Sequence, residues 1–161
     1  MESIEFRDMR PGDVSWLIKR HGALYAAEEG FDESFSERVG HVLADYVAHR
    51  DASCERAWIA QHNGRQIGSV FCMREGRPGV ARLRLFLIEP AYRGQGLGAR
   101  MLARVLTYAR DCGYYRLAVS TYASHDAACA LYARYGFVLT EERPVQSFGQ
   151  SLVEQSWEIV L

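Results

Sequence analysis

Residues 83–100 read LRLFLIEPAYRGQGLGAR, and this stretch decides the fold. An apolar run stops at Pro90, a basic turn with three glycines follows, and from Leu97 apolar residues recur at helical spacing. The pattern predicts a strand, a tight loop and a helix. Glycines lack a Cβ, so successive backbone N–H groups can converge where the helix also presents its unpaired amides and the positive end of its dipole. Such a loop is suited to bind a phosphate or pyrophosphate group.

Two common phosphate-binding loops do not fit this stretch. The nucleoside-triphosphate loop needs Gly-Lys-Ser/Thr, whereas Gly98 is followed by Ala-Arg. The dinucleotide loop needs G-x-G-x-x-G and an acidic residue roughly 20 residues further on, at the end of the next strand. Here the glycines run G-x-G-x-G, and residues 120–122, at the end of the next expected strand, are Ser-Thr-Tyr. Nicotinamide chemistry is therefore disfavoured.

Two motifs together resemble a known family. Arg93-x-x-Gly96-x-Gly98, after a strand that ends at Pro90, resembles the acetyl-CoA pyrophosphate loop of the GCN5-related N-acetyltransferases, or GNAT family. Residues 127–137 read AACALYARYGF and resemble the A-x-x-x-Y-x-x-x-G-F helix of that family. The motifs occur in the family's order, separated by a helix and a strand. The resemblance covers about residues 66 to 139.

The resemblance implies an α+β GNAT fold in a single domain over residues 1–161. Its core would be a mixed, mostly antiparallel twisted sheet of about seven strands, splayed between strands 4 and 5 and flanked by about four helices. Hydrophobic periodicity, Asn-Gly and Pro-Gly turns and helix-start signals predict the matching order β-α-α-β-β-β-α-β-α-β-β. The expected strands are 4–9, 57–61, 66–73, 80–89, 115–121, 137–145 and 151–160, and the expected helices are 11–27, 34–49, 97–111 and 125–135.

Composition sets the class of protein. The chain has 161 residues, 48% of them hydrophobic, and a net charge of −1, which disfavours disorder and nucleic-acid binding by bulk charge. No apolar run approaches the roughly 20 residues of a membrane span, and the first six residues lack the features of a signal peptide. We therefore expect a cytoplasmic protein that does not bind membranes. The four cysteines form no C-x-x-C pair, and no histidine has metal-ligand spacing, so we expect no metal.

The resemblance implies acetyl-CoA as cosubstrate and assigns residues to it. The amides of residues 94–99 would face the pyrophosphate, with positive charge from Arg93 and, as a second candidate, Arg100. The strand before the loop would bind the pantetheine arm through its backbone, and the amide of Ile88 would polarise the thioester carbonyl. His125 replaces an asparagine that hydrogen-bonds the arm in many relatives, and is either a ligand or merely exposed. The expected cofactor-binding residues are Phe86, Leu87, Ile88, Arg93, Gly94, Gln95, Gly96, Leu97, Gly98, Ala99 and His125.

Tyr132 matches the family's tyrosine, whose hydroxyl protonates the departing thiolate. The alternative for Tyr132 is a core aromatic residue without a chemical role. The base that deprotonates the amine stays open, because Ser120 stands where some relatives carry a glutamate. The candidates are Glu28, Glu89, or a water relay to a side chain near the end of the first helix.

Residues 20–32 mix aromatic and acidic side chains and are expected to form the acceptor lid. Tyr25, Glu28 and Phe31 would contact the acceptor, which we expect to be a small-molecule primary amine acetylated by direct transfer in a ternary complex. One alternative is a protein or peptide N-acetyltransferase. Another is a regulatory module that senses acetyl-CoA without turnover, favoured by the departures at Ser120 and His125. The terminal segments also resemble acetyltransferase domains that often follow MarR-type DNA-binding domains, and a homodimer is possible.

Overall fold

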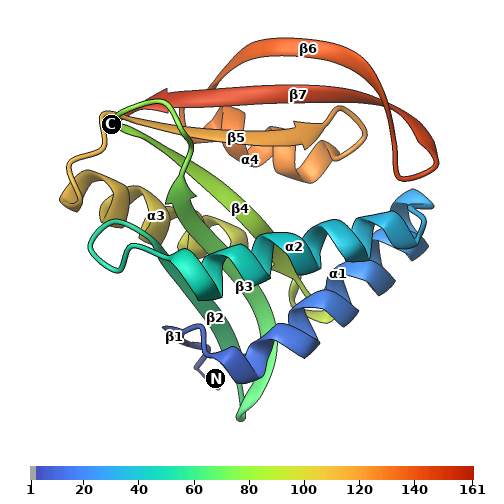
Figure 1. Cartoon of the computed structure of the whole chain (residues 1–161), viewed down its shortest axis with the longest axis horizontal. Helices are drawn as coiled ribbons and strands as arrows, with labels where there is room; N and C mark the ends of the chain where they lie inside the picture. Colours follow the sequence, from blue (N-terminus) through green and yellow to red (C-terminus); the bar gives the residue numbers. More distant parts are fainter. Residues whose placement is uncertain (1–2) are drawn as a thin grey trace.

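A mixed sheet with helices on both faces forms the body of the molecule (Figure 1). The structure is a computed structural model that describes residues 3–161. Seven strands lie in the order β1-β2-β3-β4-β5-β7-β6. The strands are β1 (Glu5–Asp8), β2 (Arg56–His62), β3 (Arg65–Arg74), β4 (Val80–Ile88), β5 (Arg116–Tyr122), β6 (Val138–Ser147) and β7 (Gln150–Val160). The helices are α1 (Val14–Glu29), α2 (Glu33–His49), α3 (Leu97–Asp111) and α4 (Asp126–Arg134), with short 3-10 turns at Pro11–Asp13 and Pro90–Tyr92.

The predicted order of elements is confirmed, and the boundaries differ by a few residues. The first helix differs most: α1 begins at Val14 after a 3-10 turn at Pro11–Asp13, instead of at residue 11, and it continues to Glu29 instead of residue 27. Gly30 ends α1 in the left-handed conformation (φ 72°), and its N–H donates to Ala26 O. The acidic pair Glu28 and Glu29 therefore lies on the last helical turn.

The predicted splay between β4 and β5 is confirmed. These parallel strands pair only from Val80–Arg116 to Arg82–Ala118, whereas β4 stays paired with β3 as far as Ile88. The β3–β4 ladder contains a bulge, in which Leu85 has a φ of 47°. Positive φ is unusual for a leucine, and bulges of this kind often redirect a strand beside a functional site. The bulge comes just after the point where β4 leaves β5.

Two apolar cores hold the helices on the sheet. On one face, α3 and α4 pack on the sheet through residues such as Leu102, Val105 and Tyr132. On the other face, α1 and α2 pack through Leu17 and Leu43. Figure 1 shows α1 and α2 crossing the sheet together on the side away from α3. None of the helices in the described part of the chain is both long and apolar enough to span a membrane.

Candidate active site

A cavity of about 440 Å³ lies where β4 splays from β5. Four segments line it: the last turns of α1, the end of β4, the glycine loop with the start of α3, and the start of α4. All the predicted cofactor residues line it except Gln95, whose side chain instead donates to Ala91 O (3.2 Å). Tyr25 and Glu28 line it as well. The fold therefore brings residues about 100 positions apart around one space.

The glycine loop has the backbone of an anion cradle. Gly94 and Gly96 have φ values of 73° and 80°, which favour glycine, and a Cβ on either would meet nothing within 4 Å. Arg100 N–H donates to Gly96 O (3.2 Å), so the amides of residues 97–99 have no acceptor inside the helix. These free amides and the helix dipole favour a negatively charged group at this end of the cavity.

The end of β4 turns backbone groups toward the opening. Glu89 N–H donates to Ile67 O of β3 (2.8 Å), and successive residues of a strand alternate the direction of their N–H and C=O groups. The N–H and C=O of Ile88 therefore point away from β3, and Ile88 O accepts a hydrogen bond from Arg93 Nε (3.0 Å). The amide predicted to polarise a carbonyl is oriented for that role.

Two arginine–glutamate pairs tie α1 to the strand end and loop. Arg93 donates from Nη1 and Nη2 to the two carboxylate oxygens of Glu28 (2.7 and 3.1 Å). Arg20 donates to both carboxylate oxygens of Glu89 (2.7 Å each). Glu89, one of the candidate bases, is thus held by a bidentate ion pair, and its position favours support of the loop over proton transfer. Glu28 is about two-fifths exposed and accessible from the cavity.

His125, the residue before α4, contacts α1 across the cavity. Its Nε2 lies 2.8 Å from Glu29 Oε1, and Ser124 Oγ donates to the other oxygen of Glu29 (3.1 Å). Both His125 and Glu29 are mostly buried, with 17% of each side chain exposed. Glu29 is one of the side chains near the end of the first helix considered for a water relay, but its pairing with His125, 96 positions away, was not predicted because no motif marks it.

Tyr132 is buried behind the cavity wall and does not line the cavity. Its ring packs on Phe137 with centroids 5.3 Å apart. Burial raises the pKa of Tyr132, and the neighbouring Tyr25 phenol and Cys129 thiol raise it further. Burial also raises the pKa of Tyr25 to about 12. Both phenols are therefore protonated near neutral pH, and Tyr25 is the one that faces the cavity.

Phe31 lies outside the cavity, in an aromatic cluster behind Tyr25. Only 5% of Phe31 is exposed, and its ring lies 5.4 Å from Tyr25 and 5.7 Å from Tyr122. Phe35 and Phe148 complete the cluster. In this position Phe31 orients Tyr25 by packing.

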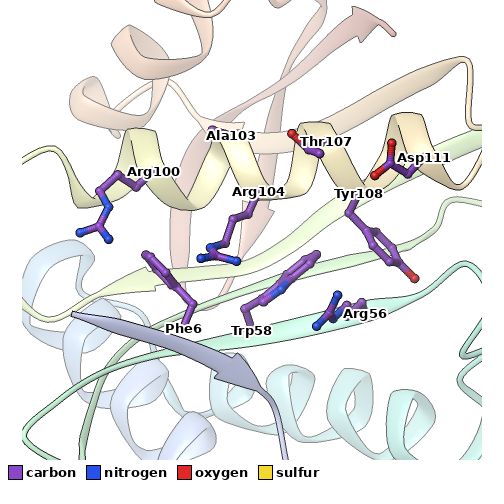
Figure 2. A pocket seen from close by; sticks show the side chains of 9 residues that line it. All are labelled: Phe6, Arg56, Trp58, Arg100, Ala103, Arg104, Thr107, Tyr108 and Asp111. Atoms are coloured by element: carbon purple, nitrogen blue, oxygen red, sulfur yellow. The ribbon is translucent and has the colours of Figure 1, made fainter. Parts of the chain in front are cut away.

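A second cavity of about 480 Å³ lies between α3 and strands β1 and β2 (Figure 2). Arg100 and Arg104 extend from α3 over the ring of Phe6, at 5.0 and 4.4 Å from its centroid. Arg100 therefore points away from the glycine loop. Within residues 3–161 we find no group of three or more His, Cys, Asp or Glu side chains arranged to hold a metal.

Comparisons with known proteins agree with this architecture. Residues 16–137 match the family model described as the acetyltransferase (GNAT) family. The L-amino acid N-acyltransferase MnaT of Escherichia coli (strain K12) is 33% identical over 57 residues, 35% of this chain and 33% of that protein. N-acetyltransferase 8F1 of Rattus norvegicus is 29% identical over 107 residues, 64% of this chain and 45% of that protein. The chain thus spans about a third to a half of the length of these relatives.

A solved structure shares the fold. The structure of yncA from Salmonella typhimurium with its cofactor acetyl-CoA matches with a TM-score of 0.80 and 20% identity, covering 98% of this chain and 94% of that one.

Proposed function

The chain belongs to the acetyltransferase (GNAT) family, and from this we propose that it transfers the acetyl group of acetyl-CoA to a primary amine of a small molecule, by direct transfer in a ternary complex. One observation carries the proposal: the amide cradle at the start of α3 and the outward-facing backbone of β4 line the same cavity. When bound, acetyl-CoA supplies an activated thioester. The open Cβ positions of Gly94 and Gly96 leave room for a pyrophosphate close to the backbone.

The residues of the chain take three roles in this proposal. The amides of residues 94–99 hold the negative charge of the pyrophosphate, and the N–H of Ile88 polarises the reacting carbonyl. The phenol of Tyr132, whose pKa is raised by burial, gives a proton to the leaving thiolate, and the nearby Tyr25 lines the cavity. Glu28, alone or through a water, takes the proton of the amine, since Glu28 lines the cavity and is more exposed than Glu89, which does not line it.

Thiol release tests the proposal. The purified protein is mixed with acetyl-CoA and a panel of small amines, peptides with free N-termini and lysine peptides, and free coenzyme A is measured. We expect turnover with small amines. Turnover with peptides alone would make the chain a peptide N-acetyltransferase.

A sensing module is the second candidate. Two observations favour it: Ser120 stands where an acid could act and accepts a hydrogen bond from Arg82 (2.8 Å), and His125 is paired with Glu29. If the protein binds acetyl-CoA tightly but releases no coenzyme A in the presence of any of the amines, the proposal of a sensing module replaces that of an enzyme.

Four wider expectations stay predictions. They are a single domain over residues 1–161, a homodimer, a cytoplasmic location, and a natural fusion to a MarR-type regulator. Sedimentation of the purified chain would decide the oligomeric state.

A further inference from the structure

Arg84 is a half-buried cation that has no hydrogen-bond or ion-pair partner among residues 3–161. It lies on β4 two residues beyond the last pair with β5, and opposite Phe71 of β3. Cross-strand partners point to the same face of a sheet, and Phe71 belongs to the core beneath α1 and α2. Arg84 therefore points to the α1–α2 face. No carboxylate or carbonyl oxygen of residues 3–161 lies within hydrogen-bonding distance of its guanidinium.

Two more arginines, Arg82 and Arg38, lie near enough to Arg84 for their charges to act on it. Burial lowers the pKa of Arg84, and the positive charges of Arg82 and Arg38 lower it further. Arg82 donates to Ser120 and lies 3.7 Å from Glu75, while Arg38 comes from α2. We call Arg38, Arg82 and Arg84 the arginine cluster.

The acidic residues around this cluster already have partners. Glu75 and Glu158 pair with Arg77, and Glu154 pairs with Arg143 (3.1 Å). Asp45 of α2, the carboxylate whose charge reaches Arg84, lies 3.3 Å from His49. Arg82 therefore has Glu75 as a counter-ion, whereas neither Arg38 nor Arg84 forms an ion pair within residues 3–161.

Burying a cation among like charges without a counter-ion destabilises the fold. Such an arrangement is expected where a bound ligand supplies the counter-ion. A guanidinium group can bind a carboxylate through two parallel hydrogen bonds, so a carboxylate is a suitable anion.

The cluster is connected to the cavity through Tyr122. The charge of Arg38 acts on the Tyr122 phenol, and the Tyr122 ring lies 5.8 Å from that of His125, which lines the cavity. Tyr122 and Ser120 lie two residues apart on β5, so their side chains share one face of the sheet. Arg84 itself lies two residues before Phe86 on β4, and Phe86 lines the cavity.

We propose that the arginine cluster binds the carboxylate of the acceptor, so that the acceptor is a small amine that also carries a carboxylate. This inference rests on the proposed function of the cavity. The amine lies toward the cavity beside Tyr25 and Glu28, and the carboxylate lies against Arg84. Arg84 is then a specificity residue that takes no part in proton transfer.

The test compares acids with their carboxamides, which keep the amine and lose the negative charge. Glycine, L-leucine, L-phenylalanine and 4-aminobutanoate are each measured against the matching amide, by calorimetry on the protein saturated with coenzyme A and by thiol release with acetyl-CoA. We expect at least one acid to bind and react about tenfold or more better than its amide. Arg84→Met should remove this preference, mainly by raising KM for the acid, and should leave the amide unchanged. Arg84→Lys should restore part of it.

A matched control and a stability measurement exclude a structural explanation. Arg104→Met removes the same charge in the second cavity and should change neither acid nor amide. Because Arg84 has no ion-pair partner in the part of the chain that the structure describes, Arg84→Met should leave the melting temperature unchanged or raise it, whereas a structural arginine would lower it.

The outcomes separate the two proposals. Equal binding of acids and amides, no binding of either, or an equal loss of both in Arg84→Met would overturn the inference. A clear preference for acidic peptides over the small acids would also overturn it. Arg84-dependent binding of an acid without any thiol release would uphold the inference and overturn the proposed acetyl transfer.

Discussion

Gly96→Ala tests whether the glycine loop holds the cofactor. Gly96 precedes α3 with a φ of 80°, and a Cβ there would meet nothing within 4 Å. The substitution therefore causes no clash in the free protein, and its cost is that of a left-handed backbone, about 1–2 kcal/mol for a residue other than glycine.

That energy can appear in two places. If the loop keeps its conformation, the free energy of unfolding falls by about 1–2 kcal/mol, or about 2–4 °C in Tm for each kcal/mol in a chain of this length. If the loop relaxes to negative φ, its amides no longer converge. Coenzyme A must then return the loop to its original conformation on binding, and the energy this requires lowers the affinity. Coenzyme A affinity then falls by roughly 5- to 30-fold, since about 1.4 kcal/mol is a factor of ten. A methyl group between backbone and pyrophosphate would weaken binding further.

Gly113→Ala is the matched control. Gly113 follows the other end of α3, with a φ of 86° and no atom within 4 Å of a Cβ. It should lose the same stability and keep full affinity. Calorimetry with coenzyme A and thermal unfolding measure both quantities on both variants. If Gly96→Ala binds coenzyme A within twofold of the unaltered protein and also loses no stability, the loop is not the pyrophosphate site.

Three further predictions concern single side chains. Tyr132→Phe should lower kcat by about 10²-fold, at the low end for a general acid, and leave the Kd of coenzyme A within twofold; comparable losses in both would make Tyr132 a packing residue. Glu28→Gln frees Arg93 from an exposed ion pair worth up to about 1 kcal/mol, so calorimetry should show coenzyme A binding up to about fivefold tighter, and weaker binding would contradict this. Burial lowers the pKa of His21 to about 4, below its ordinary value near 6.5, so the unfolded chain takes up the proton first as the pH falls. The free energy of unfolding, measured by chemical denaturation, should fall by about 2 kcal/mol between neutral pH and pH 5. His21→Leu should remove this fall. If the variant loses as much stability at pH 5 as the unaltered protein, His21 is not its cause.

Sequence predicted the secondary structure well because its signals are local. Asn63-Gly64 marks the β2–β3 turn, and the Pro90 and glycine spacing marks the end of β4 and the start of α3. The prediction of the splay came from the family resemblance, because no residue of β4 indicates where its pairing with β5 ends. Likewise, the left-handed Leu85 could not be foreseen, because leucine carries no preference for that conformation.

Some parts of the candidate site could likewise be predicted from sequence, and others could not. The position of the glycine loop at the cavity could be predicted from sequence, because glycine spacing reports backbone conformation. Its binding of the cofactor stays a prediction. The partners were not found. Glu28 meets Arg93, and Glu29 meets His125, only because α1 ends beside the loop and α4. Their separations of 65 and 96 residues leave no local pattern.

By itself, the sequence determined the strand–loop–helix passage at residues 80–111 and its resemblance to the acetyltransferase family, because glycine, proline and helix-start preferences act over a few covalently linked residues. Tertiary structure alone decided which side chains face that passage. It buried Phe31 and Tyr132 outside the cavity, paired Arg93 with Glu28, and left Arg84 without an ion pair to any of residues 3–161. The physical reason is that burial and ion pairing depend on distances across the fold, which the packing of helices on the sheet sets and no short stretch of sequence contains.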